Sequence, residues 1–168
     1  MRDTIAVELA NADLGSAGDL RMWLRDTGED DHADELSLRL PEFLELRASL
    51  RELLAAASEG RPLPTDAVAR LNETSVRVPR VARLDEGVVS LEPMAGSAAA
   101  LVLATIAWSA IDLLGGPERD RIRRCGADLR FFVATRPDRV WCSDRCGNRI
   151  RVARHHARLR APTYPVPG

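Results

Sequence analysis

The chain has 168 residues and a net charge of −1, and 45% of its residues are hydrophobic. This length fits one domain, or one domain with a small appended module, and is enough to bury a hydrophobic core. Three cysteines, an odd number clustered in the C-terminal third, argue against a closed disulfide framework. Charges interrupt the first residues, which lack the apolar stretch of a signal peptide, so we expect a cytoplasmic protein.

Charge is distributed unevenly along the chain. Residues 118–160 contain 13 arginines and 5 acidic residues, a local charge of +8, which leaves −9 for the rest. All 24 basic residues are arginines, the side chain best suited to bidentate phosphate and guanine contacts. A basic C-terminal block on an acidic body predicts a surface for an anionic partner, unless the block docks on its own body.

The first part of the chain predicts mostly helices. The apolar run at residues 4–12 is either a strand or a first helical turn. The segment SAGDLRMWLRD predicts a helix capped near Ser16 or Gly18. Residues 27–35 read as an acidic loop, and a proline in the first turn and regularly spaced leucines predict a long helix over 41–60.

The middle of the chain combines helices with one hairpin. A helix capped by Thr65 runs to Asn72, and residues 79–84 and 88–93 predict two strands joined by Asp-Glu-Gly. The apolar segment 95–116 has the length of a membrane span, but it is rich in alanine and interrupted by Asp112. We therefore expect no membrane association and a buried central helix, followed by a short charged helix over 117–124.

The cysteines indicate a metal site. Residues 130–135 and 138–141 predict two short strands, and a helix beginning near residues 143–147 presents Cys146 in its first turn. A ligand pair, a hairpin and a second pair at a helix start is the layout of a treble-clef zinc module, which needs four ligands. Cys125, Cys142 and Cys146 supply three.

The sequence leaves the identity of the fourth ligand undecided. Asp128 follows Cys125 with two residues between them, so its carboxylate is the best candidate, with water as the second. His155 is nine residues beyond Cys146, about 13 Å along a continuous helix, which is too far to share the site. The remaining alternative is that no metal binds and the thiols are simply packed.

At these residues the chain resembles a known family. The segment RVWCSDRCGNRIRVARHHARLR resembles the CGNR zinc finger, and upstream phrases such as LRASLRELLAAASEGRPLP and AALVLATIAWSAIDLLGG resemble its ABATE-type partner domain. The resemblance implies a bacterial, stress-linked transcription regulator whose finger binds DNA. It also implies that Cys125, Cys142 and Cys146 are three of the four zinc cysteines. The chain departs from the family at the fourth, because the segment between Cys125 and Phe131 is short and holds no second cysteine.

The final helix is the candidate nucleic-acid contact. Ile150, Ala153 and Ala157 form one apolar stripe, which should pack against the hairpin or the body. Basic side chains cover the remaining sides, more than a small module can pair internally, although Arg149 could instead pair with Asp144 or Asp128. The candidate DNA-contacting residues are Arg145, Arg149, Arg151, Arg154, His155, His156, Arg158 and Arg160.

These observations predict a mainly α fold: a helical body with a small hairpin at residues 1–117, a zinc-finger-like module at 118–160, and an extended tail at 161–168. We find no nucleophile–base set and no phosphate-binding glycine motif, so we expect no enzyme. The leading hypothesis is a DNA-binding regulator whose body senses a signal or binds a partner. The alternatives are a protein-interaction module, such as a homodimer without nucleic-acid affinity, and a small-ligand-binding protein.

Overall fold

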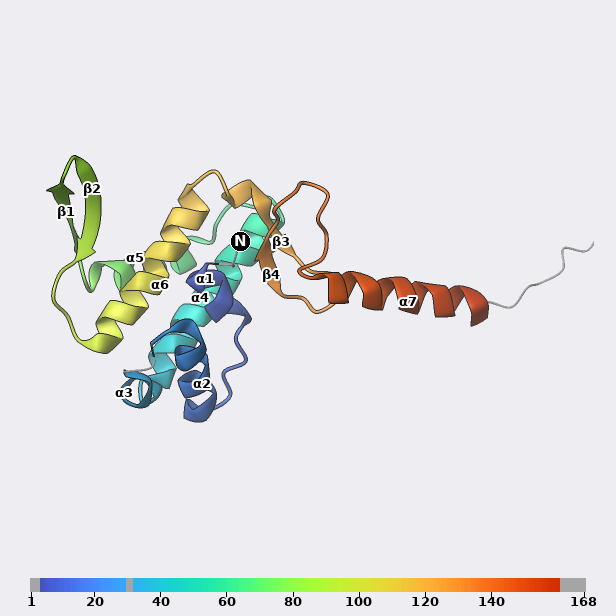
Figure 1. The fold of residues 1–168 in the computed structure, drawn as a ribbon, viewed down its shortest axis with the longest axis horizontal. Helices are drawn as coiled ribbons and strands as arrows, with labels where there is room; N and C mark the ends of the chain where they lie inside the picture. The colour runs from blue at the N-terminus through green and yellow to red at the C-terminus, as the bar shows by residue number, and fades with distance from the viewer. Residues whose placement is uncertain (1–3, 30–31, 161–168) are drawn as a thin grey trace, which may run out of the picture.

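The computed structural model describes residues 4–29 and 32–160, and the mainly helical fold with minor β-structure is confirmed (Figure 1). The predicted tail at 161–168 lies outside the described residues. Two separate antiparallel hairpins, β1–β2 and β3–β4, accompany the helices. In chain order the elements are α1 Ile5–Asn11, α2 Ala17–Thr27, α3 Ala33–Ser37, α4 Leu40–Ser58, α5 Thr65–Val76, β1 Arg80–Asp85, β2 Val88–Pro93, α6 Ala98–Gly115, the 3-10 turn η2 Arg119–Arg121, β3 Ile122–Arg124, β4 Phe131–Val133 and α7 Asp144–Arg160.

A large apolar cluster holds most of the body together. The predicted long helix is confirmed as α4, which packs against α1, α5 and α6 and buries Phe43, Leu46, Leu50, Leu53 and Leu54. Helix α6 begins at the Ser97 cap, whose hydroxyl accepts from the amide of Ala100. Among the described helices, α6 alone is long and apolar enough to span a membrane. In the structure it contributes ten buried residues to the body, as expected of a core helix.

The N-terminal segment differs from expectation in one place. The run at residues 4–12, left open between strand and helix, forms the helix α1, and Ser16 caps α2 as predicted. The predicted acidic loop is shorter than expected, because residues 33–37 form the helix α3. Ala33 and Leu36 are fully buried, so burial of apolar side chains overrides the acidic composition of this segment.

Helix α5 and the first hairpin follow the prediction closely. Pro64, not Thr65, is the N-cap of α5, and the helix continues four residues past Asn72. In the hairpin, Leu84 pairs with Val89 and Ala82 with Leu91 across the strands. The hairpin stands away from the body at the opposite end of the molecule from α7 (Figure 1). All of its strand residues except Arg80 are exposed.

The second hairpin corrects two predictions. Residues 117–124 do not form a charged helix: after η2 the chain extends into β3, which pairs with β4. Residues 138–141 form no strand. The prediction missed β3 because arginines dominate its sequence, while its one apolar residue, Ile122, is fully buried in the core of the body. The predicted hairpin between the two ligand pairs is therefore a hairpin around the first pair.

Two hydrogen bonds between one side chain of the body and the backbone of β4 join the C-terminal module to the body. The side-chain amide of Asn11, at the end of α1, donates to the carbonyl of Phe131 at 2.7 Å and accepts from its amide at 2.8 Å. Phe131 itself belongs to the apolar core of the body, whereas Phe132 faces a separate small cluster with the cysteines. Adjacent residues of β4 thus face two different cores, as the two-residue period of a strand requires.

Candidate metal centre and basic helix

The turn between β3 and β4 positions the first two candidate ligands. The amide of Cys125 donates to the carbonyl of Arg130 at 2.8 Å, and the amide of Leu129 donates back to the carbonyl of Cys125 at 2.9 Å. Leu129 takes a left-handed conformation, with φ of 62°, that closes the turn. The carboxylate of Asp128 accepts from the amide of Arg130 at 3.3 Å. The short segment after Cys125 is thus a tight knuckle that brings Asp128 to the position expected of a second ligand.

The start of α7 positions the other two ligands. Cys142 lies just before the helix and Cys146 in its first turn, where the hydroxyl of Ser143 accepts from the amide of Cys146 at 3.3 Å. Trp141 packs over this turn. A Cβ atom at Gly147 would lie 3.1 Å from the Trp141 ring, so the glycine after Cys146 leaves room for the indole.

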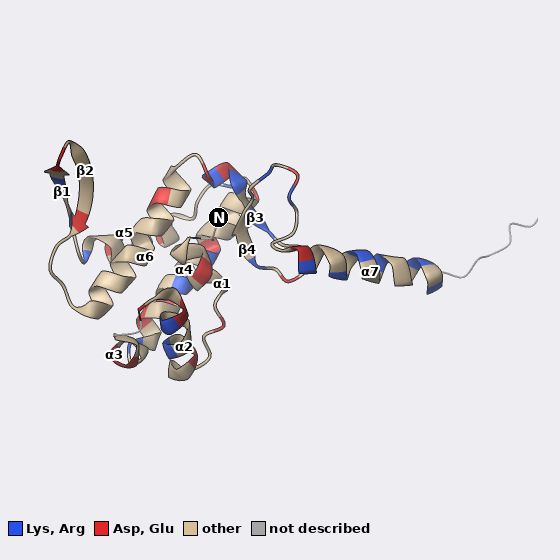
Figure 2. Ribbon diagram, viewed as in Figure 1, with Lys and Arg blue, Asp and Glu red and all other residues tan. Residues whose placement is uncertain are grey.

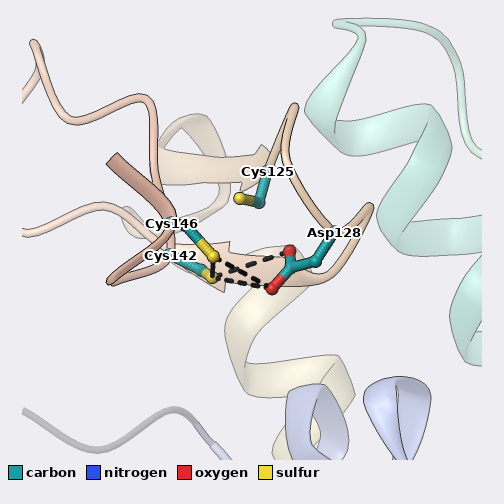
Figure 3. A group of neighbouring side chains, drawn as sticks. All are labelled: Cys125, Asp128, Cys142 and Cys146. Carbon is teal, nitrogen blue, oxygen red and sulfur yellow. Dashed lines mark hydrogen bonds between the residues drawn. The ribbon is translucent and has the colours of Figure 1, made fainter. Parts of the chain in front are cut away.

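The structure brings the four predicted ligands together (Figure 3). One ligand atom from each of Cys125, Asp128, Cys142 and Cys146 lies within 4.8 Å of the others. The Sγ atoms of Cys142 and Cys146 are 3.6 Å apart, and they lie 3.4 and 3.2 Å from Oδ2 of Asp128. No group of this kind elsewhere in residues 4–29 and 32–160 meets the same criterion. His155 and His156 lie further along α7 and are not part of it.

These separations fit a tetrahedral zinc site. With Zn–S bonds of about 2.3 Å and a Zn–O bond of about 2.1 Å, tetrahedral geometry sets S···S pairs about 3.8 Å apart and S···O pairs about 3.6 Å apart. The observed distances between Cys142, Cys146 and Asp128 are within a few tenths of these values. The donor chemistry fits as well, because zinc accepts both thiolate and carboxylate ligands. The bound ion would join the β3–β4 turn to the start of α7.

The Asp128 carboxyl and the Cys142 thiol of the cluster differ in their readiness to ionise. Burial opposes ionisation of Asp128, but hydrogen bonds from Cys125, Cys146, the Arg130 amide and Cys142 outweigh it and lower the pKa of its carboxyl to about 2. Burial raises the pKa of the Cys142 thiol to about 12, reinforced by the neighbouring cysteines and Asp128. The protein alone therefore keeps Asp128 ionised and Cys142 protonated, and a divalent cation would supply the charge that stabilises the thiolate.

Two arginines brace this centre. Arg139 donates to the carbonyls of Trp141 and Cys142, at 3.0 and 2.5 Å, and its guanidinium lies 5.4 Å from the centre of the Phe132 ring. Arg149 donates to the carbonyl of Ala127 at 2.7 Å and so ties α7 to the turn that holds Cys125 and Asp128. The suggested pairing of Arg149 with Asp144 or Asp128 is absent from the contacts of the described residues. Sequence reasoning missed Arg139, since nothing in its sequence context distinguishes it from the surrounding arginines.

The outer half of α7 projects from the module as a free helix (Figures 1 and 2). Every residue from 151 to 160 is exposed, and the helix has no acidic residue after Asp144. The expected docking of the Ile150–Ala153–Ala157 stripe is wrong for both alanines, because the helix leaves the body before it reaches them. Arg151 donates to the side chain of Asn148.

Comparison with known families supports the same two-part organisation. A model described as ABATE, "Putative stress-induced transcription regulator", matches residues 3–117, and a model described as the CGNR zinc finger matches residues 121–159. No curated protein matches the chain. The CGNR match and the Cys/Asp cluster together support zinc as the cofactor. The chain therefore belongs to the ABATE family, whose description is "Putative stress-induced transcription regulator", and carries a CGNR zinc finger at residues 121–159.

Proposed function

We propose that this chain is a cytoplasmic DNA-binding transcription regulator that contacts duplex DNA through the outer half of α7. The observation that carries the proposal is the exposure of all ten residues from 151 to 160, which include four arginines and two histidines and no acidic residue. A helix with this charge and no internal partners for most of its cations has a surface suited to phosphates.

The geometry of the helix fits the major groove. At 100° per residue, Arg151, Arg154 and Arg158 lie on one side of α7. A helix is about 10–12 Å across with its side chains and the major groove is about 12 Å wide, so the projecting half, about 15 Å long, has the dimensions to lie in the groove. Arg154 and Arg158 make no hydrogen bond or ion pair within residues 4–29 and 32–160, which leaves their guanidinium groups free for phosphates or base edges.

The zinc site has an orienting role in this proposal. The metal would join the start of α7 to the β3–β4 turn, and Asn11 fixes that hairpin to the body through Phe131. The direction of the projecting helix is therefore set by the body. This arrangement suits a regulator in which the ABATE domain senses a signal or a partner and the finger contacts DNA.

Salt-dependent binding tests the proposal. The wild-type chain should bind a labelled duplex of mixed sequence in fluorescence anisotropy at low salt, and the affinity should fall steeply as salt increases. The double variant Arg154→Gln/Arg158→Gln should reduce the slope of log K against log salt by about 1.8, since each lost phosphate contact removes about 0.9. The matched control Arg61→Gln/Arg83→Gln removes the same charge from ion pairs on the body and should leave the slope unchanged.

The alternative of a protein-interaction module gives a different result in the same assay. A homodimer or partner-binding protein would show no duplex binding at low salt, or binding that the α7 and body variants weaken equally. Either result would contradict the proposal. Binding to RNA instead of duplex DNA is tested in the same assay by replacing the duplex with a single-stranded RNA of the same sequence.

A further inference from the structure

A polar hollow lies where the body meets the segment leading to the finger. Its volume is about 500 Å³, at the C-terminal half of α6. It is distinct from the metal centre and from α7. The polar side chains that line it come from four segments and are Thr4, Arg80, Thr105, Ser109, Asp112 and Glu118.

Arg80 is the fixed cation of this hollow. Its guanidinium lies 3.9 Å from the centre of the Trp108 ring, and the indole of Trp108 is held by a 3.1 Å hydrogen bond to the carbonyl of Ser75. The Arg80 side chain is 27% exposed, and its closest carboxylate oxygen, on Asp112, is 3.9 Å away. Within the part of the chain that the structure describes, the guanidinium makes no hydrogen bond. Arg80 thus forms an ion pair with Asp112 but keeps its N–H donors available for a ligand.

Helix α6 and the segment after it supply hydroxyls and carboxylates beside Arg80. Thr105, Ser109 and Asp112 follow the i, i+4, i+7 spacing that places them on one side of α6, an otherwise strongly apolar helix. Glu118 adds a second carboxylate after the helix. The hydroxyl of Thr4 is buried and has no hydrogen-bond partner among residues 4–29 and 32–160. An unpaired buried polar atom costs free energy that a bound ligand can recover.

The charge pattern selects a class of ligand. A purely anionic molecule would meet the carboxylates of Asp112 and Glu118, and a purely cationic one would compete with Arg80. A molecule with one carboxylate and one ammonium group satisfies both sides. We propose that this hollow binds a free α-amino acid, with the carboxylate on Arg80 and the ammonium group on Asp112 and Glu118, and the hydroxyls of α6 alongside.

The hollow is connected to the finger by direct contacts. Glu118 forms an ion pair of 3.5 Å with Arg121, which donates to the carbonyls of Ala134 and Thr135 at 2.8 and 3.0 Å. Arg139 contacts the hydroxyl of Thr135 at 3.4 Å and the carbonyl of Cys142. A ligand that engages Glu118 competes with Arg121 for its carboxylate and so acts at the first link to the metal centre. The regulatory effect of the amino acid rests on the proposed DNA binding. The binding of the amino acid to the hollow does not.

The test uses the full-length, zinc-loaded chain and the twenty common L-amino acids one at a time. Calorimetry should detect at least one with a Kd below about 10 mM. The matching amine without the carboxylate, and the matching acid without the amine, should each bind at least about tenfold more weakly, because each loses a charge-assisted contact. Arg80→Gln and Asp112→Asn should weaken binding by a similar factor. The control Arg83→Gln, on the same strand but outside the hollow, should leave it unchanged.

A second variant guards against misfolding. If Arg80→Gln lowers the melting temperature, Ser109→Leu fills the hollow without removing the Arg80–Trp108 contact and should abolish binding by itself. Binding of no amino acid in the panel, or binding that neither Arg80→Gln nor Ser109→Leu weakens, would overturn the inference.

DNA affinity measured in parallel separates the two proposals. Saturating amino acid should change the affinity for duplex DNA about fivefold or more, the usual scale of allosteric coupling. Amino-acid binding without any DNA binding would support the hollow and overturn only the proposed function. DNA binding without binding of any amino acid would overturn only the proposed ligand site. If both DNA and an amino acid bind but neither changes the affinity for the other, the proposed coupling is overturned.

Discussion

The body and the zinc finger are stabilised in different ways. The body buries a large apolar cluster drawn from α1 to α6 and extended by Ile122 and Phe131 of the second hairpin, beside a small cluster around Trp108. The finger has a cluster of only four buried residues, Cys125, Phe132, Ala134 and Cys146, two of which are candidate metal ligands. A segment of about 40 residues cannot bury enough apolar surface to fold alone, so metals or covalent links usually substitute for a core. The body should therefore be independent of zinc and the finger should depend on it.

Removal of zinc should have the largest effect. Structural zinc contributes an apparent binding free energy of about 10–16 kcal/mol to small modules, so a strong chelator should unfold the finger. Hydrogen exchange followed by mass spectrometry should show loss of protection in peptides covering residues 125–147, with little change in α4 and α6. Metal analysis of the untreated protein should give one zinc per chain. Protection of residues 125–147 that survives chelation would contradict the comparison.

A core substitution in the body should destabilise the body and leave zinc binding by the finger unchanged. Phe43 is fully buried and contacts Trp23 edge-on, at a centroid distance of 6.4 Å. Phe43→Ala should reduce the free energy of unfolding of the body by about 3–5 kcal/mol, through lost burial and the cavity left behind. Urea unfolding monitored by circular dichroism measures this change. The zinc content of the folded variant should stay at the wild-type level, and a parallel loss of zinc would show that the two regions do not fold independently.

Substitutions at Asp128 sharpen the difference, because they alter the finger alone. Asp128→Asn removes the anionic oxygen and should weaken zinc binding by about tenfold or more, equivalent to about 1.4 kcal/mol. Asp128→Cys restores four thiolates, the more common set for structural zinc, and should strengthen binding. Competition with a chromophoric chelator measures both affinities. Equal affinities for wild type, Asn and Cys variants would mean that Asp128 is not a ligand.

Loss of the arginine brace should have the smallest effect. Arg139→Gln removes two charge-assisted hydrogen bonds to backbone carbonyls, those of Trp141 and Cys142. We expect a loss of about 1–2 kcal/mol of local stability and faster zinc release to a chelator. Arg136→Gln is the matched control, as Arg136 is exposed and its side chain makes no hydrogen bond or ion pair in residues 4–29 and 32–160. Equal zinc-release rates for the two variants would rule out the bracing role.

Several features of the fold could be predicted because they depend on local patterns. The spacing of leucines in α4, the serine cap of α2 and the hairpin around Gly87 are short-range signals, and all appear in the structure. Helix α3 and strand β3 were missed. In both, one or two buried apolar residues among many charges determine the structure, and their burial depends on distant parts of the chain.

The same distinction between local patterns and long-range packing applies to the candidate site. The sequence by itself determined the residue types of a metal site, the tight spacing of Cys125 and Asp128, and a cationic final helix. Only the tertiary structure decided that Asp128 lies within 3.4 Å of two cysteine sulfurs, that Arg149 faces the metal turn, and that residues 151–160 remain uncovered. Distances between residues far apart in the chain depend on how the hairpin and α7 dock, and that docking is a property of the packed molecule.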